Sequence, residues 1–328
     1  MSTSSSAKGP LGPTWQPVYD GCYSTMMQIF NLPHLSALTF LYVIIETIRG
    51  NLVISPLMPV VAIFVMARVP FVGCCMSICM HRYFAHSAFK TSRFFQFILA
   101  IVGCMAIQGG ILWWASKHIR HHKHCDLPDD PHSPRNSGKM YAWLGWLYHE
   151  TSHDWAYLPK RVLTPEVLVV NMMFPFVNMF VTMALIPYVG KEWALFLCWI
   201  PGIFGALATT RFNVDYHPPP EDPVDGVCYG INKKNGDKGI GPIRLEWVAE
   251  NAPWLFEPLV GEAYHDDHHE YPMRAHRPGY DIPYELVLKP LARLGVIWDL
   301  QQPLPTDPHA KLSDKKYPVH DPDSKKES

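Results

Sequence analysis

Histidine is the most informative residue in this sequence, because imidazoles recur at spacings suited to binding metal ions. The chain has 328 residues, of which 17 are histidines. Eight of these fall in three short clusters: His81 and His86; His118, His121 and His122; His265, His268 and His269. In the second and third clusters the spacing is i, i+3 and i+4, which places three imidazoles on one face of a helix. Neutral imidazole is the commonest metal ligand, so the clusters predict a metal centre.

The first cluster and one later element have a different spacing. His81 and His86 are separated by about 140° around an α-helix with roughly 3.6 residues per turn. We therefore expect these two side chains to reach different ions, unless one of them lies at a helix end. Asn213 and His217 again stand at i and i+4, directly after an apolar stretch.

The number of imidazoles indicates the kind of metal. One histidine near a membrane surface is usually an ordinary polar residue, but packing gives no reason to repeat imidazole at these spacings. Zinc binds about four ligands, whereas the three clusters and His217 supply nine nitrogens. Nine nitrogens fit two ions of about five or six ligands each, and imidazole suits iron. The sequence therefore predicts a dinuclear iron centre.

Long apolar stretches surround the clusters. Residues 35–80 contain only three charged side chains, and residues 167–210 are interrupted only by a charged turn at 190–192. A helix needs about 20 apolar residues to cross a bilayer, so each zone is long enough for two spans. The earlier span of the first zone, residues 35–48, is short. The sequence predicts an all-α integral membrane protein with about four transmembrane helices.

Residues 94–114 form a further apolar segment of suitable length, but this segment joins two of the histidine clusters. A crossing would place those clusters on opposite sides of the membrane. We therefore expect a helix that dips into the interface or lines a pocket.

Basic residues predict the orientation. Residues 81–161 contain ten lysines or arginines and the part after Thr210 contains fourteen, whereas the connections near Arg49 and Lys191 contain one each. Basic segments stay in the cytosol, so we expect a cytosolic helical cap that holds the histidines, and two cytosolic termini. The first residues lack the features of a secretory or mitochondrial signal. The final residues 325–328 (KKES) resemble a dilysine retrieval signal, which favours the endoplasmic-reticulum membrane.

The average composition conceals this division. A net charge of −1 argues against a nucleic-acid-binding protein, and 48% hydrophobic residues exclude a disordered chain. Eight cysteines do not indicate a disulfide scaffold. The mean hydropathy of −0.01 arises because apolar spans and a polar cap cancel. We expect an N-terminal cytosolic segment (1–33), a membrane domain (34–300) and a polar tail (301–328).

The clusters and their surroundings resemble the membrane fatty-acid desaturases, and among them the stearoyl-CoA branch that makes a first, Δ9-type double bond. The matching strings are residues 81–90 (HRYFAHSAFK), 113–114 (WW), 130–133 (DPHS), 261–269 (GEAYHDDHH) and 295–300 (GVIWDL). His265 stands where front-end desaturases carry Gln, which argues against that branch. The resemblance covers residues 35 to 300 approximately.

This resemblance implies a role for each matching residue. Nine histidines would bind two iron ions (Fe2+): His81, His86, His118, His121, His122, His217, His265, His268 and His269. Asn213 would hold a metal-bound water. Gln108, Trp114 and Thr209 match positions around the kink of a tunnel that holds a saturated acyl chain below the irons.

The implied activity is an oxygen-dependent desaturation of an acyl-CoA or an acyl-lipid. An unactivated methylene has no acidic proton, so an oxidant formed from O2 and two external electrons must remove hydrogen, and geometry selects the position. No His-Pro-Gly-Gly string of a fused cytochrome b5 is present. A separate cytochrome b5 with its NADH reductase is therefore the implied partner, or ferredoxin if the enzyme is plastidial.

Two alternatives remain. A hydroxylase or ketolase could use the same centre, although the strings around the clusters favour desaturation. A non-catalytic membrane metal-binding protein would be favoured by a missing ligand, but all nine positions are filled.

The chain also departs from the branch. Ile119 stands where Arg is frequent, Lys117 where acyl-CoA enzymes carry Asp, and Thr210 where an aromatic residue is common. A proline-rich loop at 218–244 is unexpected as well. These departures leave the acyl carrier, the chain length and the double-bond position open.

Polar residues near the clusters receive simpler interpretations. Asp266 and Asp267 are expected to hydrogen-bond to imidazole N–H groups and fix the ring orientation. His124 could support the second cluster, and His132 could order its loop. His149 and His153 are interpreted as surface residues.

Overall fold

Helices make up almost all of the regular structure in the computed structural model, which describes residues 9–215, 217, 262, 268–269, 271–277 and 281–301. The α-helices are α1 (Gly12–Ile29), α2 (Leu32–Ile48), α3 (Leu57–Val60), α4 (Arg93–Cys104), α5 (Ile111–His124), α6 (Pro134–Ser137), α7 (Trp146–His149), α8 (Pro165–Met172), α9 (Phe174–Ala194), α10 (Ile200–Asp215) and α15 (Lys289–Arg293). The π-helical segments are η1 (Val61–Ala85), η2 (Tyr141–Gly145), η5 (Leu195–Trp199) and η7 (Tyr284–Leu288), and short 3₁₀ turns are η3 (Trp155–Tyr157) and η4 (Lys160–Val162). The predicted proline-rich loop, and the polar tail apart from Gln301, lie outside the described residues.

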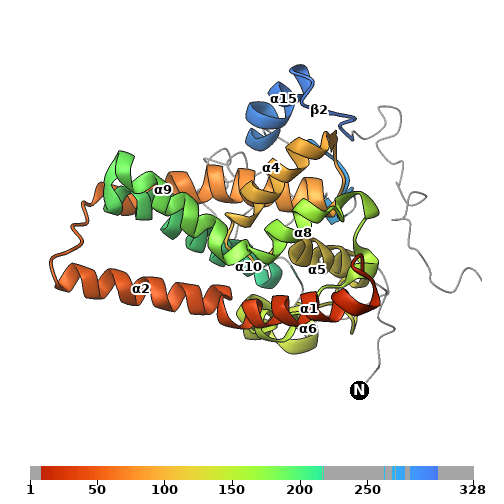
Figure 1. The fold of residues 1–328 in the computed structure, drawn as a ribbon, viewed down its shortest axis with the longest axis horizontal. Helices are drawn as coiled ribbons and strands as arrows, with labels where there is room; N and C mark the ends of the chain where they lie inside the picture. The colour runs from red at the N-terminus through yellow and green to blue at the C-terminus, as the bar shows by residue number, and fades with distance from the viewer. Residues whose placement is uncertain are drawn as a thin grey trace, which may run out of the picture.

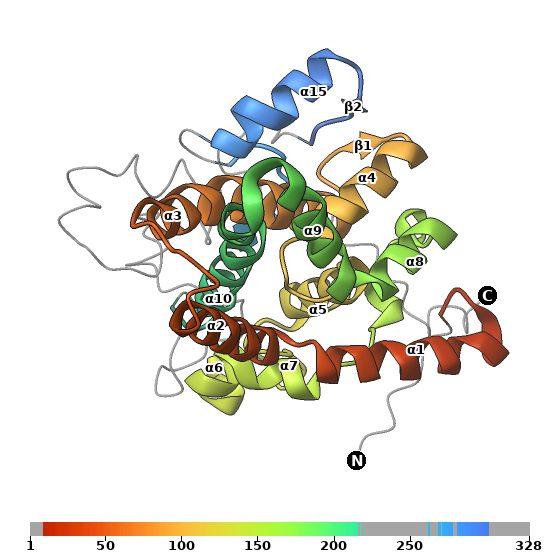
Figure 2. The ribbon, with the colours of Figure 1, turned by 60° about the vertical axis from the view of Figure 1, so that its left-hand side comes forward.

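Helices α1 and α2 form a long arm along one edge of the molecule, and α15 lies on the opposite side (Figures 1 and 2). The arm bends by 41° at the junction, where Asn31 caps α2 by accepting a hydrogen bond from the N–H of His34. Tyr23 and Met27 of α1 are buried in the main core. The predicted domain boundary at residue 33 falls within α2 and stays a prediction, as does the boundary at residue 300.

Two helices of the described chain are long and apolar enough to cross a membrane, namely Leu57–Ala85 and Phe174–Val214. The bent pair α1–α2 passes the same test when it is taken as one span. Large apolar side chains remain exposed on these helices, including Ile48 at 81% and Tyr188 at 85%. Such side chains suit contact with lipid.

The helix Phe174–Val214 is not one straight rod. Gly190 has a φ of 81° and a ψ of 161°, outside the helical region. The Asn178 side-chain amide donates to the carbonyl of Cys198, 20 residues later, whereas an unbroken helix would separate these residues by about 30 Å. The chain therefore reverses near Gly190, where the sequence predicts a turn.

The predicted single helix over 94–114 is wrong. Helix α4 ends at Cys104 and α5 begins at Ile111, with a non-helical link between them. Ile107 in this link has a positive φ of 55° and Gly109 one of 86°, conformations that end a right-handed helix. The segment therefore does not form one straight membrane crossing.

A small antiparallel sheet attaches the C-terminal part of the described chain to the end of η1. Strand β1 (Lys90–Thr91) pairs with β2 (Ile297–Trp298), with Lys90 opposite Trp298. The pairing lies just after His86, so it brings the late part of the chain beside the first histidine cluster.

Candidate metal centre

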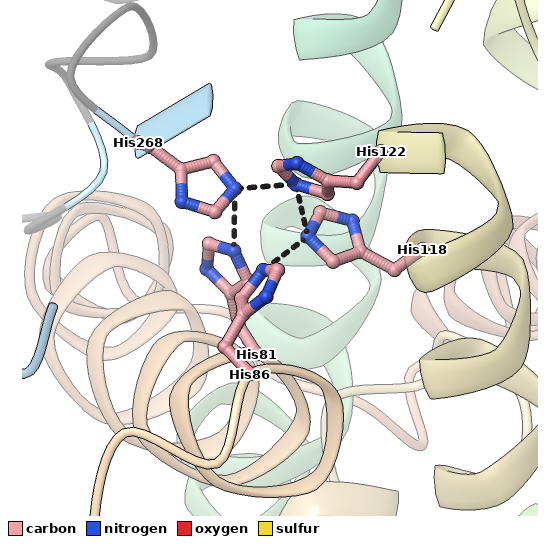
Figure 3. Close-up of side chains that lie close together, drawn as sticks. All are labelled: His81, His86, His118, His122 and His268. Atoms are coloured by element: carbon pink, nitrogen blue, oxygen red, sulfur yellow. Dashed lines mark hydrogen bonds between the residues drawn. The ribbon is translucent and has the colours of Figure 1, made fainter. Parts of the chain in front are cut away.

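Five of the predicted histidines meet at one buried point, from three parts of the chain. They are His81, His86, His118, His122 and His268, and their facing ring nitrogens all lie within 4.8 Å of one another. The rings point toward one another from η1, α5 and the segment around residue 268 (Figure 3). We call this set the five-histidine cluster.

The first pair reaches the cluster together because its local helix is not an α-helix. The backbone N–H of His86 donates to the carbonyl of His81 at 3.0 Å, an i→i+5 bond of the π-helical kind. This geometry brings the two rings to a centroid distance of 4.7 Å. His86 is the C-terminal cap of η1, so the expectation that one of the two lies at a helix end is confirmed. Whether the two rings bind one ion or two stays a prediction.

The second pair follows the expected α-helical geometry. His118 and His122 are one turn apart on α5, and their Nε2 atoms lie 3.1 Å from each other. His122 Nε2 lies 2.7 Å from His268 Nε2, and His268 Nε2 lies 3.0 Å from His81 Nε2. The cluster is thus continuous across the three elements.

A second set of histidines adjoins the first. The ring centroid of His121 lies 4.7 Å from that of His217 and 5.2 Å from that of His269. His269 also stacks on His122 of the five-histidine cluster, at 4.3 Å. The structure therefore brings eight of the nine predicted histidines into two neighbouring sets, and the ninth, His265, lies outside the described residues.

Three histidines each have a buried carboxylate facing their Nδ1 atom. One of them belongs to the five-histidine cluster and two belong to the second set. The distances are 3.0 Å from His81 to Glu262, 2.9 Å from His121 to Asp130 and 3.2 Å from His217 to Asp126. A carboxylate accepts a hydrogen bond from the N–H at Nδ1, which keeps the ring proton on that nitrogen and leaves the lone pair of Nε2 free for a metal ion. Sequence reasoning did not assign these three residues. It assigned this role to Asp266 and Asp267, which lie outside the described residues.

Glu262 is part of a buried ionic network. Its carboxylate also accepts from the hydroxyl of Ser77 and lies near the guanidinium groups of Arg82 and Arg277, at 3.4 and 3.7 Å. Arg82 in turn binds Asp281 at 2.7 Å, and both side chains are fully buried. Burial opposes ionisation of Glu262, yet His81 and the two arginines hold its pKa below the ordinary value. The carboxylate is therefore a stable anion beside His81.

The donor set fits a metal ion. Burial lowers the pKa of His118, His122 and His268 well below the ordinary value of histidine, so these rings are neutral. A neutral ring nitrogen is either a donor or an acceptor, so convergent imidazoles gain little from one another. A cation among them would bind their lone pairs, as metal binding requires neutral histidine.

A pocket is separated from the five-histidine cluster by the side chain of Trp114. The indole of Trp114 stacks on His118 with ring centroids 4.7 Å apart, and its Nε1 donates to Gln108 Oε1 at 3.1 Å. Both side chains line the pocket together with Met27, Leu32 and Thr210. Two of the three predicted tunnel residues thus lie together beside the five-histidine cluster.

The remaining predicted positions are placed differently. Thr209 is not among the lining residues of this pocket, and its hydroxyl donates to the carbonyl of Gly205. Asn213 donates to the carbonyl of Ala142 at 3.4 Å, and its role toward a metal-bound water stays a prediction. Lys117 is buried with its ammonium 2.6 Å from Glu150 and 2.8 Å from Asp154. Lys117, which stands where acyl-CoA enzymes carry Asp, therefore forms internal ion pairs in this protein.

The interpretation of His153 as a surface residue is wrong, whereas His149 is exposed as expected. The side chain of His153 is fully buried, between Asp20 and Asn171. His132 is buried against His121, and His124 Nε2 contacts the hydroxyl of Tyr157 at 3.0 Å.

Comparison with known proteins agrees with this geometry. The family model described as fatty acid desaturase matches residues 55–284. The chain is 32% identical over 246 residues to a hex-5-enoyl-[acyl-carrier protein] acetylenase of Moorena producens, which covers 70% of this chain and 73% of the relative. It is 27% identical over 194 residues to an sn-1 stearoyl-lipid 9-desaturase of Anabaena variabilis (58% and 64%), and 26% identical over 232 residues to a Delta(9)-fatty-acid desaturase of Caenorhabditis elegans (67% and 64%). The chain, with its histidine-rich site capable of binding metal, belongs to the fatty acid desaturase family.

Proposed function

We propose that this protein is a fatty acyl desaturase that introduces a cis double bond of the Δ9 type at a centre of two iron ions. The observation that carries the proposal is the buried convergence of five imidazoles, with a second histidine set beside them. The family supports an oxygen-dependent oxidoreductase with a fatty acyl substrate. Iron is proposed because histidine ligands in this number suit it better than zinc.

Different residues of the chain would bind the metal ions and orient their ligands. The eight described histidines, with His265, would hold the two ions, and Glu262, Asp126 and Asp130 orient three of the rings. With O2 and two external electrons, the iron centre would supply the oxidising power that removes one hydrogen from each of two neighbouring methylenes, and the O2 would leave as two molecules of water.

Trp114 and Gln108 form the wall where an acyl chain would approach the histidines. Buried apolar surroundings exclude water from that wall, which protects an oxidising centre from side reactions. Geometry then selects the methylenes that react, since two neighbouring carbons of one chain do not differ in chemistry. Asn213 is proposed to hold a metal-bound water, and Thr209 to line the bend of the acyl tunnel.

The acyl carrier is proposed to be coenzyme A or a glycerolipid. The relatives act on a stearoyl lipid in one case and on an acyl-carrier-protein substrate in another, by their names. In this chain Lys117 is fully engaged with Glu150 and Asp154. The carrier contact would therefore be made by other residues.

We further propose four spans, a cytosolic cap that holds the histidines, and location in the endoplasmic-reticulum membrane. The reversal at Gly190 supports counting the segments on either side of it separately. Electrons would come from cytochrome b5 and its NADH reductase, or from ferredoxin in a plastid.

Complementation tests the function directly. Expressed in yeast that lack their own Δ9 desaturase, the protein should restore growth without unsaturated fatty acid, and mass spectrometry of the lipids should detect palmitoleate or oleate. Hydroxy acids as the only new products, or no rescue despite normal expression, would refute the proposal.

One relative favours a second candidate function. The acetylenase of Moorena producens matches more of this chain than the other two relatives reported above. An acetylenase removes two hydrogens from an existing double bond, so the same histidine sites could carry out this step. The yeast lipids therefore also need examination for alkynyl chains after feeding of monounsaturated acids.

Thr210 offers a test of the pocket. It is 5% exposed and lines the pocket beside Gln108 and Trp114, so Thr210→Phe would overfill a tight space at a cost of about 1–3 kcal/mol. We expect lower kcat/KM for acyl chains in microsomes, with the iron content unchanged. Thr25→Phe, at an exposed position of α1 outside this pocket, is the matched control. Equal kcat/KM in wild type and Thr210→Phe would rule out the pocket as the acyl path.

A further inference from the structure

A buried polar chain links α1 to the first turn of α5, outside the metal centre. Asn171 on α8 is fully buried, and its Oδ1 accepts from the backbone N–H groups of Leu112 and Trp113 at 2.8 and 3.3 Å. These are among the first N–H groups of α5, which lack partners within the helix. The residue before α5 is Gly110, which has no side chain to cap them. Asn171 therefore caps α5 from another helix.

The two backbone donors fix the orientation of the Asn171 amide, because only its oxygen can accept from them. Its Nδ2 consequently points the other way, 2.9 Å from Nε2 of His153 and 2.9 Å from the hydroxyl of Tyr19. His153 Nε2 must then be the acceptor, so a neutral His153 carries its proton on Nδ1. That nitrogen lies 3.4 Å from Asp20 Oδ1.

Further contacts hold the residues at both ends of this series of hydrogen bonds. Asp20 accepts hydrogen bonds from Trp155 Nε1 at 3.0 Å and from Gln16 Nε2 at 3.1 Å. The ring of His153 stacks on Trp155, with centroids 4.3 Å apart. At the other end, a Cβ on Gly110 would come within 2.4 Å of Asn171 Oδ1, so the link before α5 is packed directly against the cap.

The capped turn lies next in sequence to the pocket residues and to the five-histidine cluster. Gln108 stands in the link that precedes the turn, and Trp114 follows it, one turn before His118 on α5. The hydrogen bond from Trp114 to Gln108 and the stacking of Trp114 on His118 connect the capped turn to the five-histidine cluster. A shift of the turn would therefore move the pocket wall relative to the metal-binding rings.

We propose that His153, with Asp20 behind it and Asn171 before it, is a positioning residue that sets the pocket wall against the metal centre. This inference rests on the proposed desaturase function. His153 accepts from Asn171 Nδ2 and so holds the amide, already oriented by the two backbone donors, in place against the first turn of α5. This position of the turn determines which methylenes of the acyl chain face the irons. It does not touch the substrate or the metal.

The test compares two substitutions in the full-length protein purified with its iron. His153→Gln keeps the pattern, because its amide oxygen can accept from Asn171 while its NH2 donates to Asp20. His153→Leu removes both contacts at similar volume. We expect His153→Leu to lower kcat by roughly tenfold to hundredfold, as small misplacements do, and to spread the double bond over neighbouring positions at unchanged iron content. His153→Gln should restore both, and the exposed His149→Leu should behave as wild type.

Three results would overturn the proposal: wild-type kcat with a single double-bond position in His153→Leu, equal defects in His153→Gln and His153→Leu, or loss of activity that merely tracks loss of iron and of folded protein. Hydrogen exchange separates this proposal from the proposed function. Amides 110–113 should exchange faster in His153→Leu than in His153→Gln, even if wild-type protein makes no double bond on any acyl substrate. Equal exchange in the two variants would refute the positioning role by itself.

Discussion

Replacing His268 with alanine should abolish product formation and lower the iron content of the purified protein. His268 is 1% exposed, and its Nε2 lies within 3.0 Å of His81 Nε2 and within 2.7 Å of His122 Nε2. It is the described residue through which the late part of the chain enters the five-histidine cluster. Without this ring the cluster would lack one of its five imidazoles, so a proposed ligand of the iron would be lost. Iron measured by elemental analysis, together with fatty-acid analysis of the expressing yeast, tests both effects.

His124→Ala is the matched control for this experiment. His124 is on α5, two residues after His122, but its Nε2 contacts Tyr157 instead of the cluster. We expect normal iron content and activity in this variant. Full activity of His268→Ala at normal iron content would refute the assignment of His268 as a ligand.

Replacing Glu262 with glutamine should weaken iron binding by about 10- to 100-fold, the range usual for partners of metal-bound histidine. The substitution keeps the shape but removes the anion that faces His81 Nδ1 at 3.0 Å. It also leaves the buried arginines 82 and 277 less compensated, and breaking one partner of a buried ion pair costs roughly 3–5 kcal/mol. The thermal unfolding temperature in detergent should therefore fall, together with the affinity for iron measured against a chelator.

Glu285→Gln provides the control for the loss of a carboxylate. Glu285 forms an ion pair with Lys289 at 2.6 Å, but both side chains are partly exposed, and such pairs contribute less than about 1 kcal/mol. We expect no change in iron affinity. If Glu262→Gln bound iron as tightly as wild type, Glu262 would have no role in orienting His81.

The sequence predicted the parts of the site that depend on local geometry. His118 and His122 share one helical face because they are one turn apart, and α5 places their Nε2 atoms 3.1 Å from each other. The same reasoning failed for His81 and His86, because the i→i+5 bond at the end of η1 changes the angle between them. The interpretation of His153 as a surface residue was wrong for another reason, because its side chain is buried against Asn171 of a distant helix. Spacing is informative only where the helix type and the helix end are known.

Contacts between distant residues could not be predicted in this way. Glu262 accepts from Ser77, 185 residues earlier, and Asn171 caps a helix whose first turn lies 59 residues before it. Carboxylates are frequent in this chain, with 29 acidic residues, so composition does not indicate which of them turns toward a histidine. The break at Ile107 depends on packing as well, since its positive φ is unfavourable for a β-branched residue.

The sequence by itself thus predicted the family and a site capable of binding metal. Imidazoles repeated at helical spacing predict a metal site, and uncharged stretches of sufficient length predict membrane helices. Both patterns can be recognised in the sequence because each depends only on residues close together in the chain. Only the tertiary structure decided which histidines share one cluster, which carboxylates and arginines stand behind them, and which pocket adjoins them. Those choices depend on how η1, α5, α8 and the segment around residue 268 pack together, and packing is set by side chains far apart in the chain.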